Sequence, residues 1–379
     1  MIAASGADLT IFAIVVLVRL LAPLLIFRFP LPAIIVCLVV DAADQTIFQQ
    51  FTDLDLTSYQ GYDKALDIYY LTIAYISTFR NWSHPAGLAV ATFLWYYRLI
   101  GVTLFELTDW RTLLLIFPNT FEYFFILFEV VRTKWNTSRL SSKQVVLAAA
   151  AIWIFIKLPQ EYWIHIAQLD TTDFLKEDVF GVAVTDSWAT ALTNRPAVTA
   201  LLLAVIIGLL VLAVRLWRRL PPADHRFTVD ADKMDAGPAP AVSTVDWKAG
   251  LVEKIVLIFL VLVIFSEGIP QLSATIPRIL LAVVVIVIAN AALGELLRRN
   301  QLFARAWGSV GLAFVATTVL NLGIFIVLQW IVPSNDDGAS RGAIALYLLL
   351  LSLIITLFDR YHPQRRPSGL REKPSIIES

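Results

Sequence analysis

Residues 40–45 place two carboxylates and an amide about halfway along an otherwise apolar run. Asp41, Asp44, Gln45 and Phe48 are spaced 3, 1 and 3 residues apart, so on an α-helix they share one face. A charged side chain at bilayer depth costs roughly 2.5–3.5 kcal/mol. Two acids at this depth must therefore face protein, water, a partner charge or a proton, and the pattern predicts a cation- or proton-binding site.

A second polar stripe follows a proline in the run 110–131. Pro118 removes a backbone donor and frees the carbonyl near residue 114, which opens a polar patch of backbone beside Asn119 and Glu122. Breaks of this kind at mid-membrane expose carbonyls to ions or substrates. The predicted ion- or proton-binding residues are therefore Asp41, Asp44, Gln45, Asn119 and Glu122.

Two arginines fall at the depth of these acids. At about 1.5 Å per residue, Arg19 lies near the middle of the first apolar run, level with Asp41, and Arg98 reaches the same level in the fourth. Both are predicted to tune the charge of the site, and a purely structural Arg19–Asp41 pair is the alternative. The acids well inside the first six runs outnumber the bases by two, so two carboxylates need a proton or a bound cation.

A further polar cluster is predicted at the outer membrane face. Asp63 and Asp67 share one helical face, as do Lys157, Glu161 and His165 near the outer end of the run 143–167. Glu161 and His165 are one turn apart, but the chain has only four histidines and no second one nearby, so we predict no metal site there. An interfacial network of polar side chains is the structural alternative.

The composition is that of a membrane protein. Of 379 residues, 58% are hydrophobic and only 16% are charged, against about 25% charged in globular domains. The mean hydropathy is +0.72, and several apolar runs reach the length of a membrane span. The net charge is zero, which gives no reason to expect nucleic acid. The expected partner is the lipid bilayer, with a small polar solute or a lipid head group as the ligand.

The predicted fold is all-α, a polytopic bundle of about eleven transmembrane helices. Basic residues gather in alternate short loops and acidic residues in the others, which predicts an N-terminus outside and a C-terminus in the cytoplasm of a multi-pass cell-membrane protein. The expected spans are residues 9–28, 31–51, 64–80, 85–106, 110–131, 143–167, 197–216, 250–268, 277–297, 307–331 and 342–359.

Polar residues divide the chain into modules. Residues 1–196 form a polar N-terminal transmembrane module of about six helices plus an outer loop, and 197–217 form a connecting transmembrane helix. Residues 218–248 contain Pro-Pro and Gly-Pro-Ala-Pro without apolar periodicity, which predicts a flexible cytoplasmic linker. An apolar C-terminal module of about four helices follows at 249–361, and a disordered basic cytoplasmic tail at 362–379.

Three functions fit these features. The first is a transporter-like protein whose outward-facing acidic site binds a proton or a monovalent or divalent cation, with a polar solute as a further candidate ligand. The second is a membrane-embedded transferase acting on a lipid-phosphate or polyprenyl-linked substrate at the outer face, in which Asp44, Asp63 and Asp67 hold a divalent metal. The third is a non-catalytic assembly subunit whose charges pair helices. No catalytic residue, cofactor or oligomeric state is predicted, because no nucleotide-binding or hydrolase signature is present.

Overall fold

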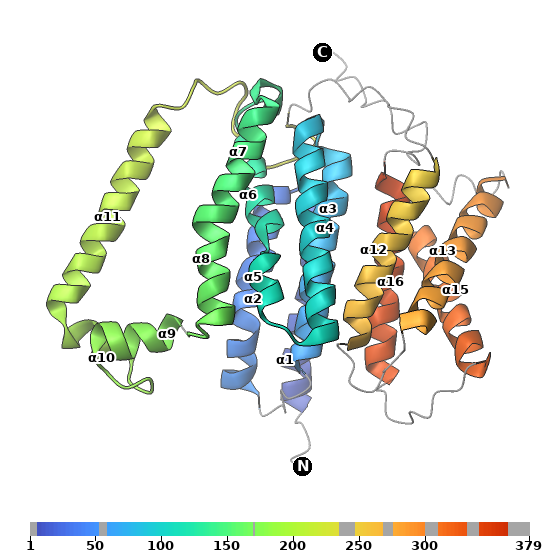
Figure 1. Ribbon diagram of the computed structural model, residues 1–379, viewed down its shortest axis with the longest axis horizontal. Coiled ribbons are helices and arrows are strands. Elements are labelled where there is room, and N and C mark those ends of the chain that lie inside the picture. Colours follow the sequence, from blue (N-terminus) through green and yellow to red (C-terminus); the bar gives the residue numbers. More distant parts are fainter. Residues whose placement is uncertain are drawn as a thin grey trace.

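The structure is a computed structural model that describes residues 6–52, 59–169, 171–234, 247–267, 276–299, 310–331 and 341–362. Within these ranges all regular secondary structure is helical, and most of the helices stand side by side along one direction (Figure 1). The predicted all-helical fold is confirmed for the described part of the chain.

The first half of the chain forms α1 to α8. Their bounds are α1 Gly6–Leu21, continued by the 3₁₀ segment Ala22–Phe27, α2 Pro30–Phe51, α3 Tyr59–Asn81, α4 Pro85–Thr108, α5 Thr112–Ile116, α6 Thr120–Arg132, α7 Ser142–Ile152 and α8 Leu158–Glu161. Two π-helical segments, Trp153–Lys157 and Tyr162–Ile166, precede and follow α8, so that α7 and α8 form one long helix.

The second half forms α9 to α16. Their bounds are α9 Thr171–Phe174, the π segment Leu175–Phe180, α10 Trp188–Asn194, α11 Pro196–Arg218, α12 Trp247–Glu267, α13 Ile276–Arg299, α15 Val310–Ile331 and α16 Arg341–Tyr361. The short helices α9 and α10 extend sideways from the bundle at the level of the end where α1 begins, and connect α8 to α11, which stands apart from the bundle (Figure 1).

Each of the eleven expected spans coincides with a helix or with consecutive helices. Within the described residues, six helices are long and apolar enough to cross a membrane. The number rises to seven if α10 and α11, which meet at a bend of 100°, count as one span. By length and composition the described helices are therefore suited to a helical membrane bundle, whereas the count of eleven and the orientation in the membrane stay predictions.

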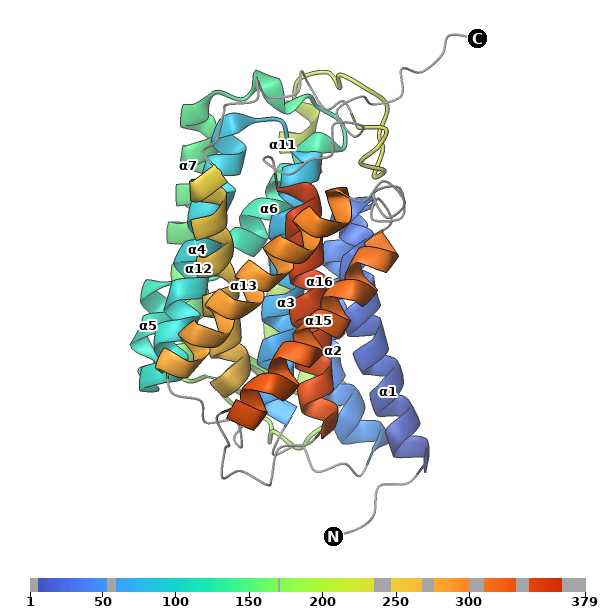
Figure 2. The ribbon, with the colours of Figure 1, turned by 90° about the vertical axis from the view of Figure 1, so that its right-hand side faces the viewer.

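Helix α3 occupies the centre of the protein, which explains its polar sequence. It packs against α2, α4, α12, α16 and the 3₁₀ segment after α1 (Figure 2). Nearly every residue from Ala65 to Phe79 is buried. Because other helices separate it from lipid, α3 can carry aspartates and tyrosines that a lipid-facing helix would exclude.

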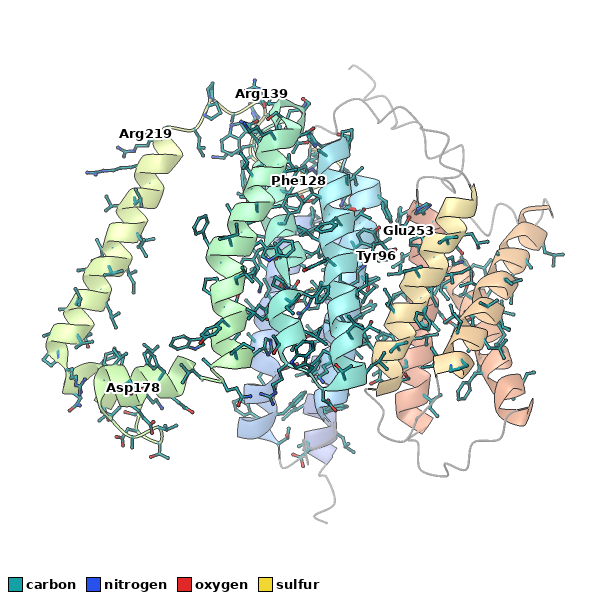
Figure 3. The ribbon with its side chains drawn as sticks, in the orientation of Figure 1. Tyr96, Phe128, Arg139, Asp178, Arg219 and Glu253 are labelled. Carbon is teal, nitrogen blue, oxygen red and sulfur yellow. The ribbon has the colours of Figure 1, made fainter. Side chains whose placement is uncertain are left out.

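The N-terminal helices join the C-terminal helices through Glu253 on α12. Its carboxylate accepts hydrogen bonds from the Tyr75 hydroxyl on α3 at 2.6 Å and the Tyr96 hydroxyl on α4 at 3.3 Å. His362, at the end of α16, approaches the other carboxylate oxygen at 3.0 Å. Figure 3 shows Tyr96 and Glu253 facing each other between α4 and α12. The two groups of helices therefore meet in a polar contact.

Ion pairs hold the first part of the predicted linker, residues 220–234, against the helices. The pairs Asp224–Arg139, Asp230–Arg28 and Asp232–Arg80 join residues 220–234 to the end of the bundle opposite the start of α1. Residues 235–246 and 363–379 lie outside the described residues, so the predicted flexibility of the linker and disorder of the tail stay predictions.

Candidate functional site

A single buried arginine gathers four aspartates from two neighbouring helices. The side chain of Arg19 on α1 is only 3% exposed. Its Nη1 donates to Asp44 and, at 2.5 Å, to Oδ1 of Asp63, while its Nη2 donates to Asp41 and, at 2.5 Å, to Oδ1 of Asp67. Asp41 and Asp44 come from α2 and the other two from α3. We call the four carboxylates the aspartate cluster.

Local sequence spacing explains why these residues meet. Asp41 and Asp44 are three residues apart, and Asp63 and Asp67 are four apart, so each pair projects from one face of its helix. Helices α2 and α3 are antiparallel neighbours. Asp44 and Asp41 lie about two to three turns, roughly 10–15 Å, before the end of α2, and Asp63 and Asp67 lie about one to two turns, roughly 6–12 Å, after the start of α3, so the two ranges overlap. The pairs consequently reach the same level of the bundle, where α1 presents Arg19.

The cluster carries more negative charge than its arginine can balance. Four aspartates against one arginine leave three negative charges when all are ionised. Asp44 is 2% exposed, but Asp41, Asp63 and Asp67 are 26%, 38% and 36% exposed, so the cluster opens on one side of the protein. Surplus carboxylates inside a membrane are costly unless protons or a bound cation offset them.

Three of these carboxylates could hold a metal ion together. One oxygen of each of Asp41, Asp44 and Asp63 lies within 4.8 Å of the others. Carboxylate oxygens are the ligands that hard cations such as Ca²⁺ and Mg²⁺ prefer. Because Arg19 donates to the same three carboxylates, a cation entering the cluster must share them with the guanidinium or displace it.

Glu122, in the first turn of α6, forms a second buried acidic position beside the cluster. The Tyr70 hydroxyl on α3 donates to its Oε1 at 2.6 Å, and the Asn119 amide donates to its Oε2 at 3.0 Å. Asp41 is near enough to interact with Glu122 electrostatically. The glutamate is 4% exposed, so its carboxyl group is buried against Tyr70 of α3 and Asn119.

The helix break predicted at Pro118 is present. Helix α5 ends at Ile116 and α6 begins at Thr120. Two backbone carbonyls at the break accept hydrogen bonds from side chains of α4. The Tyr97 hydroxyl donates to the oxygen of Ile116 at 2.9 Å, and Arg98 Nη1 donates to that of Phe117 at 3.1 Å. The direct partner of Arg98 is therefore a backbone carbonyl and not one of the aspartates.

A glycine lets α4 approach this break closely. A Cβ atom added at Gly101 would lie 2.1 Å from Cβ of Phe117, far inside van der Waals contact. No other residue fits at this position unless the break moves. Gly101 therefore positions the chain between α5 and α6, and with it Asn119.

Lys157, Glu161 and His165 lie beside the break, on the long helix formed by α7 and α8. Glu161 accepts the backbone N–H of Asn119 at 3.1 Å and pairs with His165 at 3.0 Å and with Lys157 at 3.6 Å. Lys157 also lies 4.5 Å from the ring centre of Tyr123. The adjoining π segments change the helical register around these residues, and such segments are frequent at functional sites.

The structure regroups the residues singled out in the sequence. Asp63 and Asp67, which the sequence separated from Asp41 and Asp44, belong to the same cluster around Arg19, whereas Lys157, Glu161 and His165 surround the break near Asn119. The side chain of Gln45 lies outside the described residues. Sequence reasoning left Tyr70 out of the site, although its position three residues after Asp67 places it on the same face of α3.

Comparison with known proteins finds no matching family model, no matching curated protein and no matching solved structure. Function must consequently be argued from the chemistry of the aspartate cluster and of Glu122.

Proposed function

We propose that this chain is a transporter-like membrane protein that binds a cation or a proton at the aspartate cluster. One observation carries the proposal: four carboxylates surround one buried guanidinium and leave three negative charges. One aspartate would be enough to neutralise Arg19. The negative charge of the remaining three can be offset by a bound cation or by protons.

The arrangement also provides a way to take up and release an ion. Arg19 acts as a tethered cation, because it donates to all four carboxylates that would bind an ion. Binding then favours a state in which the guanidinium has moved away from some of them. A ligand that prefers one of two states shifts the population toward that state, which is the requirement for alternating access.

Charge distribution supports an outward-facing site in an eleven-span, N-outside topology. Arg139 and Arg219 lie at the end of the bundle opposite the start of α1, and Asp178 lies at the end where α1 begins (Figure 3). Basic residues favour the cytoplasmic side of a membrane. Helices α2 and α3 bring the aspartate cluster nearer to the acidic end, which we assign to the outside of the cell membrane.

Thermal unfolding of purified protein in nanodiscs tests the proposal. Titration with Na⁺, K⁺, Mg²⁺, Ca²⁺ and acid should raise the unfolding temperature of the wild type, and the response should be lost in Asp41→Asn and Asp63→Asn. Asp109→Asn is the matched control, because Asp109 is exposed at the end of α4 with a left-handed φ of 54° that asparagine also adopts. A wild type that responds to neither ions nor acid refutes the proposal.

A second function, a transferase acting on a lipid phosphate, is favoured by the grouping of Asp41, Asp44 and Asp63. Their oxygens lie within 4.8 Å of one another, and three carboxylates suit a divalent metal that in turn binds phosphate. This function predicts stabilisation by Mg²⁺ or Mn²⁺ alone, and further stabilisation by a polyprenyl phosphate added with the metal. Responses to Na⁺ or K⁺ without an effect of polyprenyl phosphate favour the transporter.

A further inference from the structure

Glu122 differs from the other buried acids in the groups that hold it. Asp44 is paired with Arg19, Glu129 with Arg132 at 2.7 Å, and Glu161 with His165 at 3.0 Å. Both oxygens of Glu122 are instead held by neutral donors, a tyrosine hydroxyl and an asparagine amide. No described lysine, arginine or histidine nitrogen lies within 4.0 Å of its carboxylate.

Three charged residues on the neighbouring helices, Asp41, Lys157 and Arg98, also act on the Glu122 carboxylate. Asp41 approaches from α2 and repels a second negative charge. Lys157 and Arg98 favour the ionised form of Glu122 electrostatically. Their own hydrogen bonds go elsewhere, because Lys157 donates to Gln160 at 2.9 Å and Arg98 to the carbonyl of Phe117 at 3.1 Å. A glutamate that is 4% exposed and without a paired cation among the described residues is costly to ionise unless its charge is offset.

We propose that Glu122 is a proton site that exchanges with the cation of the aspartate cluster: the carboxyl group holds a proton when the cluster is empty and loses it when a cation binds. The inference rests on the proposed function and assigns the cation and the proton to separate residues. Asp41 links the two, because it contributes to the cluster and interacts electrostatically with Glu122.

For a monovalent cation the exchange balances in charge and atoms. One cation enters from the outer solution and binds the aspartate carboxylates, which offsets the negative charge of Asp41. The repulsion between Asp41 and an ionised Glu122 is then reduced, the O–H bond of Glu122 breaks and the proton passes to water on the same side. Tyr70 and Asn119 remain hydrogen-bonded to the resulting carboxylate, and donors to the charged form stabilise it. Combined with alternating access, this exchange would let protons moving in one direction drive cations in the other.

Proton release on cation binding tests the proposal. Protein in nanodiscs, in weakly buffered solution with a pH indicator, is titrated with each chloride salt that raises the unfolding temperature of the wild type. Glu122→Gln should release about one proton fewer per bound cation than the wild type, while the cation still raises its unfolding temperature. The matched control is Glu129→Gln, the same substitution at a buried, arginine-paired glutamate two turns further along α6, which should release as many protons as the wild type.

Two further measurements test the proposal even if Glu122→Gln folds poorly. Tyr70→Phe removes a donor to the ionised form of Glu122, so fewer protons should be released at the same pH and cation concentration. The infrared band of a protonated carboxyl should be present in the wild type without cation, weaken when the salt is added, and be absent from Glu122→Gln. Equal release by wild type and Glu122→Gln, or an unchanged infrared band, overturns the proposal. A wild type that binds no cation in the thermal assay overturns the proposed function instead.

Discussion

Removal of the guanidinium from the aspartate cluster should cost the protein much of its stability. In Arg19→Gln, four carboxylates remain together without a paired cation. The contact with Asp44 is buried on both sides, with exposed fractions of 3% and 2%, and breaking such a pair costs about 3–5 kcal/mol. The contacts with Asp63 and Asp67 involve side chains that are 38% and 36% exposed, so each adds only about 0–1 kcal/mol.

The assay is the free energy of unfolding in mixed micelles, followed by circular dichroism. The control is Arg28→Gln, the same substitution at a side chain that is 63% exposed and lies 3.6 Å from Asp230. It should lose no more than about 1 kcal/mol. The double variant Arg19→Gln/Asp44→Asn returns the cluster to three negative charges and should recover at least about 1 kcal/mol of the loss. If Arg19→Gln is as stable as Arg28→Gln, the guanidinium does not hold the cluster together.

Two further predictions concern the elements around the site. Gly101→Ala should lower the free energy of unfolding by about 1–3 kcal/mol, because its Cβ would collide with Phe117, whereas Gly208→Ala, at a position with open space around the new Cβ, should be neutral or slightly stabilising in the same assay. Arg80→Gln should loosen residues 220–234, because it removes the ion pair between Arg80 and Asp232, and limited proteolysis should then cut this segment faster than in the wild type. Unchanged cleavage would show that this pair does not hold residues 220–234 against α3.

The helices were predictable because the bilayer imposes a strong rule on sequence. A span needs about 20 apolar residues, and proline marks where a helix must break. The expected spans accordingly coincide with helices, and the break lies at Pro118 as expected. The polar helix α3 was harder to recognise, because its tyrosines and aspartates are tolerated only where other helices cover them.

The grouping of the polar residues was only partly predictable. Depth along the membrane follows from residue number, and it correctly put Arg19 at the level of Asp41. The rotation of one helix relative to another depends on side-chain packing that sequence does not reveal. For this reason the sequence separates Asp63 and Asp67 from the other two aspartates, although all four contact Arg19. Arg98 donates to the carbonyl of Phe117, and its predicted tuning of the site charge stays a prediction.

The C-terminal helices show how polar side chains can join helices in this protein without charge. Asn290 on α13 donates to Asn321 on α15 at 2.8 Å, and Asn321 donates to Ser352 on α16 at 2.9 Å. All three residues are buried, and this neutral ladder joins three helices without a single charge. Polar side chains of this kind are sufficient to hold membrane helices together.

In comparison with this neutral ladder, the aspartate cluster is poorly suited to a role that consists only of holding helices together. It joins three helices as well, but it does so with four aspartates and one arginine, and each ionised carboxylate beyond the first adds repulsion and the cost of burying a charge. A purely structural role would favour fewer acids or neutral amides, as the ladder of α13, α15 and α16 uses. The surplus is accounted for when the carboxylates bind a cation or a proton, and for this reason we propose such binding in preference to the assembly-subunit function.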